Sequence, residues 1–334
     1  MDRRWICSDV WLNILPFFDH AQLGLQMALL SDRFDALVDK HFDGKTELTL
    51  WKLILICKDI GPTPKLSVRL GVNFVEFPFP DRPLPNKIRF QLIHISYIDH
   101  SVIRFLRSNK QIWDRSGTKL DLNVPSSESN VQPILDVLAR QIWPIFATSI
   151  RHLSFSGGVN LDNLRRLISP TILFDLDQLS SIDCHYLYPD GIADDEPNAT
   201  AEQMLSKWLH TPTKDGQPKR LCCRDYLGPP NLEWVNNFTE AFLRATTSVS
   251  YNIQFNLFVT PMPVEPIELV NERTNEKLKR CPIGETEAVN WEDENSDANL
   301  NNVQFELTGG NNGIGPLSPS AEEEKAGQSN ENYI

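Results

Sequence analysis

The sequence has no stretch of about 18 uninterrupted apolar residues, the length that a membrane-spanning helix requires. Arg3 and Arg4 precede an apolar stretch in the manner of a signal peptide. However, Asp9 and Asn13 interrupt that stretch, and no small-residue cleavage site follows. We therefore expect no membrane contact and a cytoplasmic or nuclear location.

Cysteine pairs of the kind that hold metals are also missing. None of the six cysteines stands in a Cys-x-x-Cys motif, and the neighbours Cys222 and Cys223 have no histidine at a zinc-ligand spacing. Thiols of an intracellular chain stay reduced. We expect these cysteines to be small buried side chains, and we expect no metal and no cofactor.

The folded part of the chain has little excess charge. The net charge is −12, but residues 285–334 hold 11 acidic side chains against one lysine and so carry −10. The other 284 residues carry only −2. A nearly neutral body lacks the basic face that nucleic acid binding requires, so we expect no nucleic-acid partner.

No set of residues typical of an enzyme is present. The Gly-rich segment 309–315 imitates a phosphate-binding loop, but we expect no strand before it, and Pro316 follows it. Residues 154–158 do not form a nucleophile elbow. Because no nucleophile, base and oxyanion donor can be combined, we expect a protein that is not an enzyme.

The N-terminus, by contrast, is dense in apolar residues. Ser8 can cap a first helix that Pro16 ends, Asp19 and Gln22 can start a second, and Ser31 can cap a third. Three helices this short cannot bury all their apolar side chains in a core of their own. The excess indicates either an interface with a partner or packing against the rest of the chain, and the residues alone favour neither.

This segment resembles an F-box. The residues that match the family pattern, in order, are Ile6-Cys7, Asp9-Val10, Ile14-Leu15, Phe17-Phe18-Asp19, residues 23–30 and Ser31-Asp32-Arg33-Phe34. Cys7 stands where the pattern has proline, which removes rigidity from the N-terminal turn. The chain is also similar to a large group of nematode F-box proteins through segments such as ALLSDRFDALVDKHFDG, PLPNKIRF and YIDHSVIRFLRSNKQ, spread over most of residues 1–283.

The resemblance implies that residues 1–44 bind a Skp-type adaptor and thereby join a cullin ubiquitin ligase (SCF), as a substrate-recognition subunit. The residues expected to contact the adaptor are Ile6, Cys7, Val10, Leu12, Ile14, Leu15, Leu25, Leu29, Leu30, Phe34 and Leu37. The alternative is a non-enzymatic interaction scaffold whose F-box-like helices pack inward and have no ligase role. Binding to a Skp-type adaptor separates the two hypotheses.

The next part of the chain, residues 45–86, is predicted to hold a small β meander. Segments 47–57 and 65–79 are rich in β-forming residues and partly alternate between apolar and polar. Prolines at 78, 80, 83 and 85 then predict a stiff, extended linker.

Residues 87–260 contain an irregular repeat. Short β-type segments recur around Ile93, Leu120, Leu153, Ile182, Leu221 and Ile253, at spacings of 27, 33, 29, 39 and 32 residues, with a helical pattern between each pair. One strand and one helix in roughly 28–29 residues is the long form of a leucine-rich repeat (LRR). The consensus Asn or Cys of such repeats is mostly missing. We therefore predict an α/β fold with degenerate LRR-like repeats and parallel strands; an ordinary α/β domain is the alternative.

Alternation along these strands predicts one polar face, which is the concave face of a leucine-rich repeat. An unidentified protein substrate is expected to bind there. The candidate residues are Asp121, Asn123, Asp183, His185, Arg224 and Gln254. Arg224 is the strongest of them, because arginine is enriched at binding hot spots.

Two segments complete the chain. Residues 261–284 predict a hairpin that caps the end of the repeats, since terminal repeats need covering. Residues 285–334 are acidic and rich in Asn, Gly and Ser, and are predicted to be a disordered tail.

Overall fold

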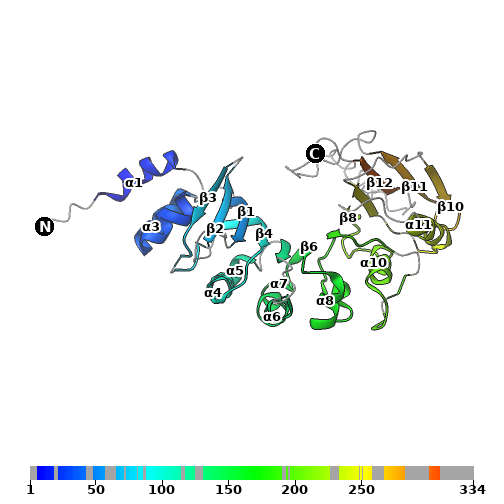
Figure 1. Ribbon diagram of the computed structural model, residues 1–334. Helices are drawn as coiled ribbons and strands as arrows, with labels where there is room; N and C mark the ends of the chain where they lie inside the picture. The colour runs from blue at the N-terminus through cyan, green and yellow to red at the C-terminus, as the bar shows by residue number, and fades with distance from the viewer. Residues whose placement is uncertain are drawn as a thin grey trace, which may run out of the picture.

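The computed structural model describes residues 6–18, 22–42, 48–56, 65–70, 73–80, 82–85, 88–113, 117–124, 131–189, 193–194, 196–225, 233–247, 249, 251–257, 267–282 and 301–308. These residues form a mixed α/β fold on one 12-stranded sheet, whose strand order is β10-β11-β12-β9-β8-β7-β6-β5-β4-β1-β2-β3. Figure 1 shows the sheet as an arc, with the helices α4 to α10 along its outer side.

Six successive strands, β4 to β9, pair in parallel, and β1 pairs in parallel with β4. The seven strands of this parallel part are β1 (Leu48–Ile56), β4 (Ile88–Ile95), β5 (Thr118–Val124), β6 (Ile150–Gly157), β7 (Ser181–His185), β8 (Lys219–Asp225) and β9 (Tyr251–Leu257). The repeat segments in the sequence therefore predicted the positions of β4 to β9 correctly.

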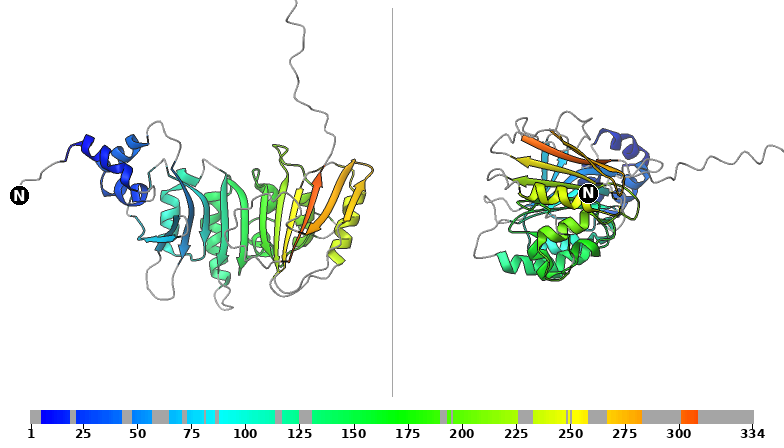
Figure 2. Two further views of the ribbon diagram at one scale, coloured as in Figure 1. Left: turned by 90° about the horizontal axis from the view of Figure 1, so that it is seen from above. Right: turned by 90° about the vertical axis from the view of Figure 1, so that its right-hand side faces the viewer.

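A helix lies in every connection between these six strands, as parallel pairing requires. The helices are α4 (His100–Ser108), α5 (Lys110–Trp113), α6 (Val131–Val137), η4 (Leu138–Ile142), α7 (Trp143–Phe146), α8 (Leu161–Leu167), α9 (Ile172–Asp175), α10 (Ala201–Leu209) and α11 (Glu233–Arg244). Figure 2 shows them layered on one face of the sheet, and none of the helices between β4 and β9 in the described part of the chain covers the opposite face.

Local signals in the sequence explain where several helices begin. The side chain of Asp99 accepts a hydrogen bond from the backbone of Val102 at 2.9 Å, and Asn160 caps α8 in the same way. Thr200 and Gln203 form a reciprocal capping box on α10. These caps satisfy backbone N–H groups that have no partner within the helix, which explains why the helices begin at these positions.

The core lies between the sheet and its helices. In β5, Leu120, Leu122 and Val124 are buried, whereas the residues between them face the other side. Trp113 sits at the centre of one aromatic cluster, with ring centroids 5.8 Å from Phe90 and 5.9 Å from Phe146. One face of β5 is therefore apolar and packed, and the other is polar.

The N-terminal helices are α1 (Ser8–Ile14), η1 (Leu15–Phe17), η2 (Leu23–Met27), η3 (Ala28–Leu30) and α3 (Asp32–His41). Pro16 lies in η1, directly after the end of α1, as expected. The prediction that Ser8 caps α1 is wrong, because Cys7 is the capping position and no side chain caps this helix. Ser31 does cap α3, by accepting a hydrogen bond from Phe34. The predicted cap at Asp19 lies outside the described residues.

The meander expected within residues 45–86 consists of β1, β2 (Lys65–Leu70) and β3 (Asn73–Phe77), which pair antiparallel in succession. It is not a separate layer, since β1 continues the main sheet by pairing with β4. At the other end, β10 (Ile267–Asn271) and β11 (Glu276–Pro282) form the hairpin predicted there.

The prediction of disorder for residues 285–334 is wrong for β12 (Asn301–Thr308). This strand is inserted between β9 and β11, with antiparallel pairing on both sides. In its sequence, Val303, Phe305 and Leu307 alternate with polar residues, which is a strand pattern. The prediction missed it because it was based on the polar composition of residues 285–334 as a whole. The strand also precedes the Gly-rich segment 309–315, where none was expected.

Candidate protein-binding surfaces

The N-terminal helices have an inner face that packs on the sheet. Leu15, Leu25 and Leu37, which were expected to contact an adaptor, are 0%, 6% and 5% exposed. They belong to the core and cannot reach a partner in this conformation. The packing is close: a Cβ on Gly24 would lie 2.6 Å from the end of the Ile88 side chain at the start of β4, so a larger residue there would require that side chain to shift.

Other large apolar side chains of the same N-terminal segment are exposed. Ile6, Val10, Phe17 and Leu30 are 46%, 48%, 87% and 64% exposed. Large apolar side chains exposed together in this way are typical of protein-binding surfaces. We call these four residues the N-terminal apolar patch.

The patch is held in place by contacts between α1 and α3. The rings of Trp11 and Phe34 meet edge to face with centroids 4.9 Å apart, and Arg33 donates a hydrogen bond to the carbonyl oxygen of Ile6 at 2.5 Å. The remaining residues that were predicted to contact the adaptor differ in how exposed they are. Cys7 is exposed, whereas the half-buried ones are Leu12, Ile14, Leu29 and Phe34.

A second candidate surface is the concave face of the sheet, opposite the helices. The pairing register places His94, Asp121, Ser154, Asp183, Cys222 and Gln254 side by side in one row across β4 to β9. The next row, toward the carboxyl ends of the strands, contains Asn123, Ser156, His185 and Arg224. All six predicted substrate-binding residues therefore lie on one face.

Two carboxylates of the central row, Asp121 and Asp183, are engaged by neighbours on the same face. Ser154 donates a hydrogen bond to one oxygen of Asp121 at 3.0 Å, and the ring Nδ1 of His94 lies 2.5 Å from the other. Arg224 donates from Nε and Nη2 to the two oxygens of Asp183, at 3.2 and 2.8 Å. Such bidentate pairs are strong and fix both partners.

This pairing changes the role expected for Arg224. Its guanidinium and the Asp183 carboxylate neutralise each other, with the two side chains only 21% and 13% exposed. The pair therefore presents a fixed polar surface rather than a net positive charge. Beside it, burial and the charge of Arg224 lower the pKa of His185, which favours a neutral imidazole at neutral pH.

The sequence interpretation missed the row nearest the amino ends of the strands. That row consists of Lys119, His152, Ser181 and Arg220. His152 and Ser181 are 2.8 Å apart and share a hydrogen bond, whereas Lys119 and Arg220 are exposed. Each residue stands two positions before a residue of the central row, so strand alternation alone would have revealed it.

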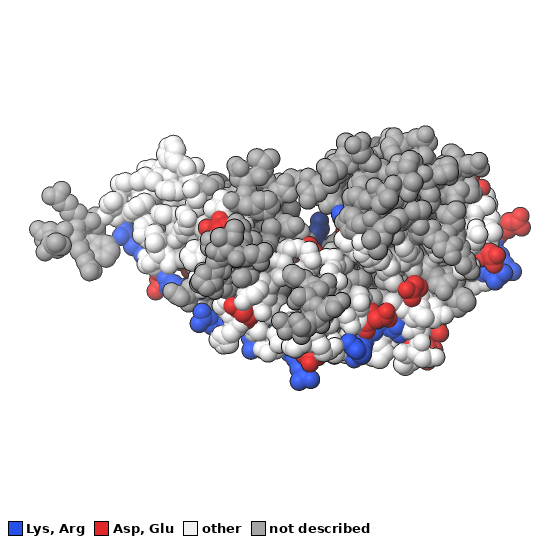
Figure 3. All heavy atoms as spheres, in the orientation of Figure 1, with Lys and Arg blue, Asp and Glu red and all other residues white. Residues whose placement is uncertain are grey.

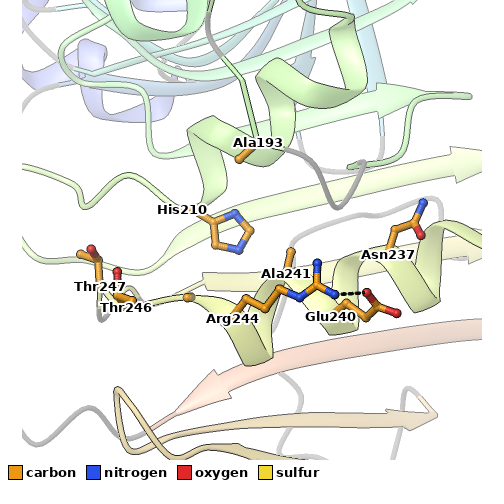
Figure 4. Close-up of a pocket in the computed structure, with 9 residues that line it drawn as sticks. Ala193, His210, Asn237, Glu240, Ala241, Arg244, Thr246 and Thr247 are labelled. Atoms are coloured by element: carbon orange, nitrogen blue, oxygen red, sulfur yellow. Dashed lines mark hydrogen bonds and ion pairs between the residues drawn. The ribbon is translucent and has the colours of Figure 1, made fainter.

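A cavity of about 510 Å³ lies between α10 and α11, lined by His210, Asn237, Glu240 and Arg244 among others (Figure 4). His210 Nδ1 donates to the carbonyl oxygen of Ser206 at 2.7 Å, and burial lowers the pKa of this histidine. Glu240 and Arg244 pair with each other at the exposed rim. The lining residues do not combine a nucleophile with a base, so the cavity supports no catalytic assignment.

No helix among the described residues is long and apolar enough to cross a bilayer. The described part of the chain also contains no group of three or more His, Cys, Asp or Glu placed to hold a metal ion. No protein-family model, curated protein or solved structure matches this chain.

Proposed function

We propose that the chain is a substrate-recognition subunit of an SCF-type ubiquitin ligase. In this proposal the N-terminal helices act as an F-box that binds a Skp-type adaptor and, through it, a cullin. The strand–helix units act as degenerate LRR-like repeats that hold a protein substrate. The chain itself is not an enzyme, and it works in the cytoplasm or the nucleus.

The observation that carries this proposal is that the apolar side chains of the N-terminal segment divide into a buried set and an exposed set. Leu15, Leu25 and Leu37 are buried inward, and the N-terminal apolar patch stays exposed outward. An F-box needs this division, because it has to be attached to its own chain while offering apolar side chains to the adaptor. Figure 1 shows α1 and α3 at one end of the arc, where a partner has access.

The substrate half of the proposal is supported by the parallel strands and their connecting helices. Stacked strand–helix units of this kind form curved arrays whose concave face offers an extended binding surface. Here that face carries paired polar groups, Asp121 with His94 and Asp183 with Arg224. We propose that the substrate forms hydrogen bonds with this polar surface and does not insert apolar side chains into it.

The alternative is an interaction scaffold whose N-terminal helices only pack inward. The tight fit of Gly24 on Ile88 is compatible with it. Phe17, at 87% exposed, has no role in such a scaffold, because an inward-packing helix gains nothing from a large apolar residue in water. The exposed patch therefore favours the adaptor-binding function.

The test is calorimetric titration of the purified chain with a Skp-type adaptor. Phe17→Asp and Leu30→Asp, made separately, are expected to weaken binding about tenfold or more, because each places a charge in an apolar interface. Asn13→Asp is the matched control, since it adds the same charge at an exposed position of α1 outside the patch. Failure of the wild type to bind, or equal effects of all three changes, would refute the adaptor role.

A further inference from the structure

The helices from α4 to α8, on the outer, convex side of the arc, carry an excess of positive charge. They contain six basic side chains against two acidic ones, a net charge of +4 when His100 is neutral. Arg165 is buried and lies beside Asp162, so the exposed basic side chains are Arg104, Arg107, Lys110, Arg140 and Arg166. We call these five residues the convex basic patch. Figure 3 shows Lys and Arg side chains along this edge of the molecule.

Hydrogen bonds between neighbouring helices connect the patch. Arg107 of α4 donates from Nη2 to Oε1 of Gln141 in η4 at 3.2 Å. Arg166 of α8 donates from Nη2 to Oε1 of Gln132 in α6 at 3.0 Å. The patch therefore extends from α4 across α6 and η4 to α8. Because packed helices lie about 8–10 Å apart, these two steps cover about 16–20 Å.

The partners of the two arginines are neutral, unlike those of several other exposed cations. Arg107 and Arg166 donate to side-chain amide oxygens, which orient a guanidinium without neutralising its charge. In both, only Nη2 is used, so the Nε and Nη1 hydrogens are available to a further acceptor. The exposed cations that pair with a carboxylate instead include Arg151 with Asp215, Lys214 with Asp177 and Arg244 with Glu240.

The carboxylates near these helices do not neutralise the patch. Asp162 lies 3.6 Å from Nη1 of Arg165, which is not part of it. Asp136 of α6 accepts a hydrogen bond from Gln132 and makes no ion pair in the described part of the chain. Asp99 precedes α4 and caps the end of the helix that is further from Arg107. The patch therefore keeps a positive potential.

We propose that the convex basic patch is a docking surface for an acidic peptide segment of a partner protein. Arginine presents paired N–H groups that match the two oxygens of a carboxylate, so each arginine can take one acidic side chain. Because amides already orient Arg107 and Arg166, these side chains lose less freedom when the partner binds. The patch lies on the side away from the concave face, and the inference does not depend on the ligase role.

The surrounding surface favours a peptide over other polyanions. The large exposed apolar side chains of the described residues all lie outside α4 to α8, so this surface has no anchor for a lipid bilayer. Nucleic acid requires a basic face over the whole domain, whereas residues 1–284 together carry −2. An extended acidic segment rises about 3.3 Å per residue, so about six residues cover the patch.

The first test is fluorescence anisotropy of the full chain with a labelled peptide of eight glutamates, at low ionic strength. Arg107→Gln combined with Arg140→Gln is expected to weaken binding at least about tenfold, because it removes two of the five charges. The matched control is Arg151→Gln combined with Arg244→Gln. It removes the same charge from exposed arginines that already pair with carboxylates, and should weaken binding less than about twofold. No binding by wild type, or an equal loss in the control, would overturn the proposal.

The second test changes the partner of Arg107 and keeps the arginine. Gln141→Glu preserves the length and shape of the side chain but places a carboxylate where the amide oxygen is. This charge neutralises Arg107 in the way that Asp215 neutralises Arg151, so peptide binding should fall at least about fivefold. Gln217→Glu, the same change at an exposed position outside the patch, is the control and should have little effect. Unchanged binding by Gln141→Glu, or an equal loss with Gln217→Glu, would contradict the inference.

Two other polyanions are titrated into the same proteins to check the class of partner. They are a single-stranded DNA of 12 nucleotides and vesicles that contain phosphatidylserine. Both are expected to bind more weakly than the peptide, with no difference between wild type and Arg107→Gln combined with Arg140→Gln. Tighter binding of either one than of the peptide, lost in that variant, would assign the patch to nucleic acid or to a membrane and refute the peptide proposal.

Discussion

The ion pair between Asp183 and Arg224 connects the neighbouring strands β7 and β8 on the concave face. Strand alternation correctly placed Asp183 and Arg224 on the polar side, because side chains in a strand alternate at a period of two. It did not predict that they pair with each other. That contact joins residues 41 positions apart and depends on the register between β7 and β8, which no local pattern encodes.

Lys219 carries the clearest consequence for stability at this scale. It begins β8, is 4% exposed, lies 4.6 Å from the ring centroid of Trp208 and donates to the carbonyl oxygen of that residue. Burial lowers its pKa to about 7. In the unfolded chain the pKa is about 10.4, so between these values the unfolded state binds more protons. The free energy of unfolding is therefore expected to rise with pH from about 7 to about 10, by up to about 1.4 kcal/mol per pH unit.

Urea unfolding at pH values across this window checks that prediction. Lys219→Met should flatten the rise, because it removes the titrating group and keeps an apolar stem of similar length. Lys214→Met, at a side chain 74% exposed, is the control and should leave the rise intact. Burial lowers the pKa of His210 and raises that of Tyr251, so these two groups act below and above the window. Burial also raises the pKa of Cys223, so this thiol opposes the rise above about pH 8.5, equally in wild type and in both variants. An identical pH profile for Lys219→Met and wild type would show that burial does not lower the pKa of Lys219.

At the scale of whole elements, short-range signals were sufficient for most of the fold. The caps at Ser31, Asp99, Asn160 and Thr200 depend on contacts within three residues, and all four are present. The strands β4 to β9 were predictable because each buries one apolar face. By contrast, β12 was missed, because its place in the sheet depends on pairing with β9 and β11.

The position of β12 predicts that the two parts of the C-terminal region differ in their effect on stability. Removing residues 301–334 strips backbone partners from both β9 and β11, and each lost hydrogen bond costs about 0.5–1.5 kcal/mol. The melting temperature should fall by at least about 5 °C. Removing only residues 309–334 leaves every described strand pair in place, so the melting temperature should change by about 2 °C or less.

Thermal melts of the full chain and the two truncations, followed by circular dichroism, measure this difference. The shorter truncation is the matched control, because it removes residues 309–334 and leaves β12 and its pairing intact. Equal melting temperatures for all three proteins would mean that β12 contributes nothing to the sheet. A large fall already on removal of residues 309–334 would place additional structural contacts beyond Thr308.

For the molecule as a whole, one continuous sheet connects the two proposed surfaces. The N-terminal helices pack at the β4 end, where Gly24 meets Ile88, and the polar rows of the concave face extend from β4 to β9. In a linear array each unit contacts only its neighbours, so a change at one end is not transmitted far. Four strand steps, about 19 Å, separate β4 from β8, which is beyond the range at which mutational effects usually couple.

The two binding activities are therefore expected to be separable. Phe17→Asp should weaken adaptor binding and leave the set of other proteins captured by the chain unchanged. Asp183→Ala combined with Arg224→Ala should do the reverse, and removing both members of the pair leaves no unpaired buried charge. The measurement is calorimetry with the adaptor together with quantitative mass spectrometry of captured proteins, with a thermal melt of each variant to establish folding. If a folded variant of either kind loses both activities, adaptor and substrate bind to one shared surface, and the assignment of two separate surfaces is wrong.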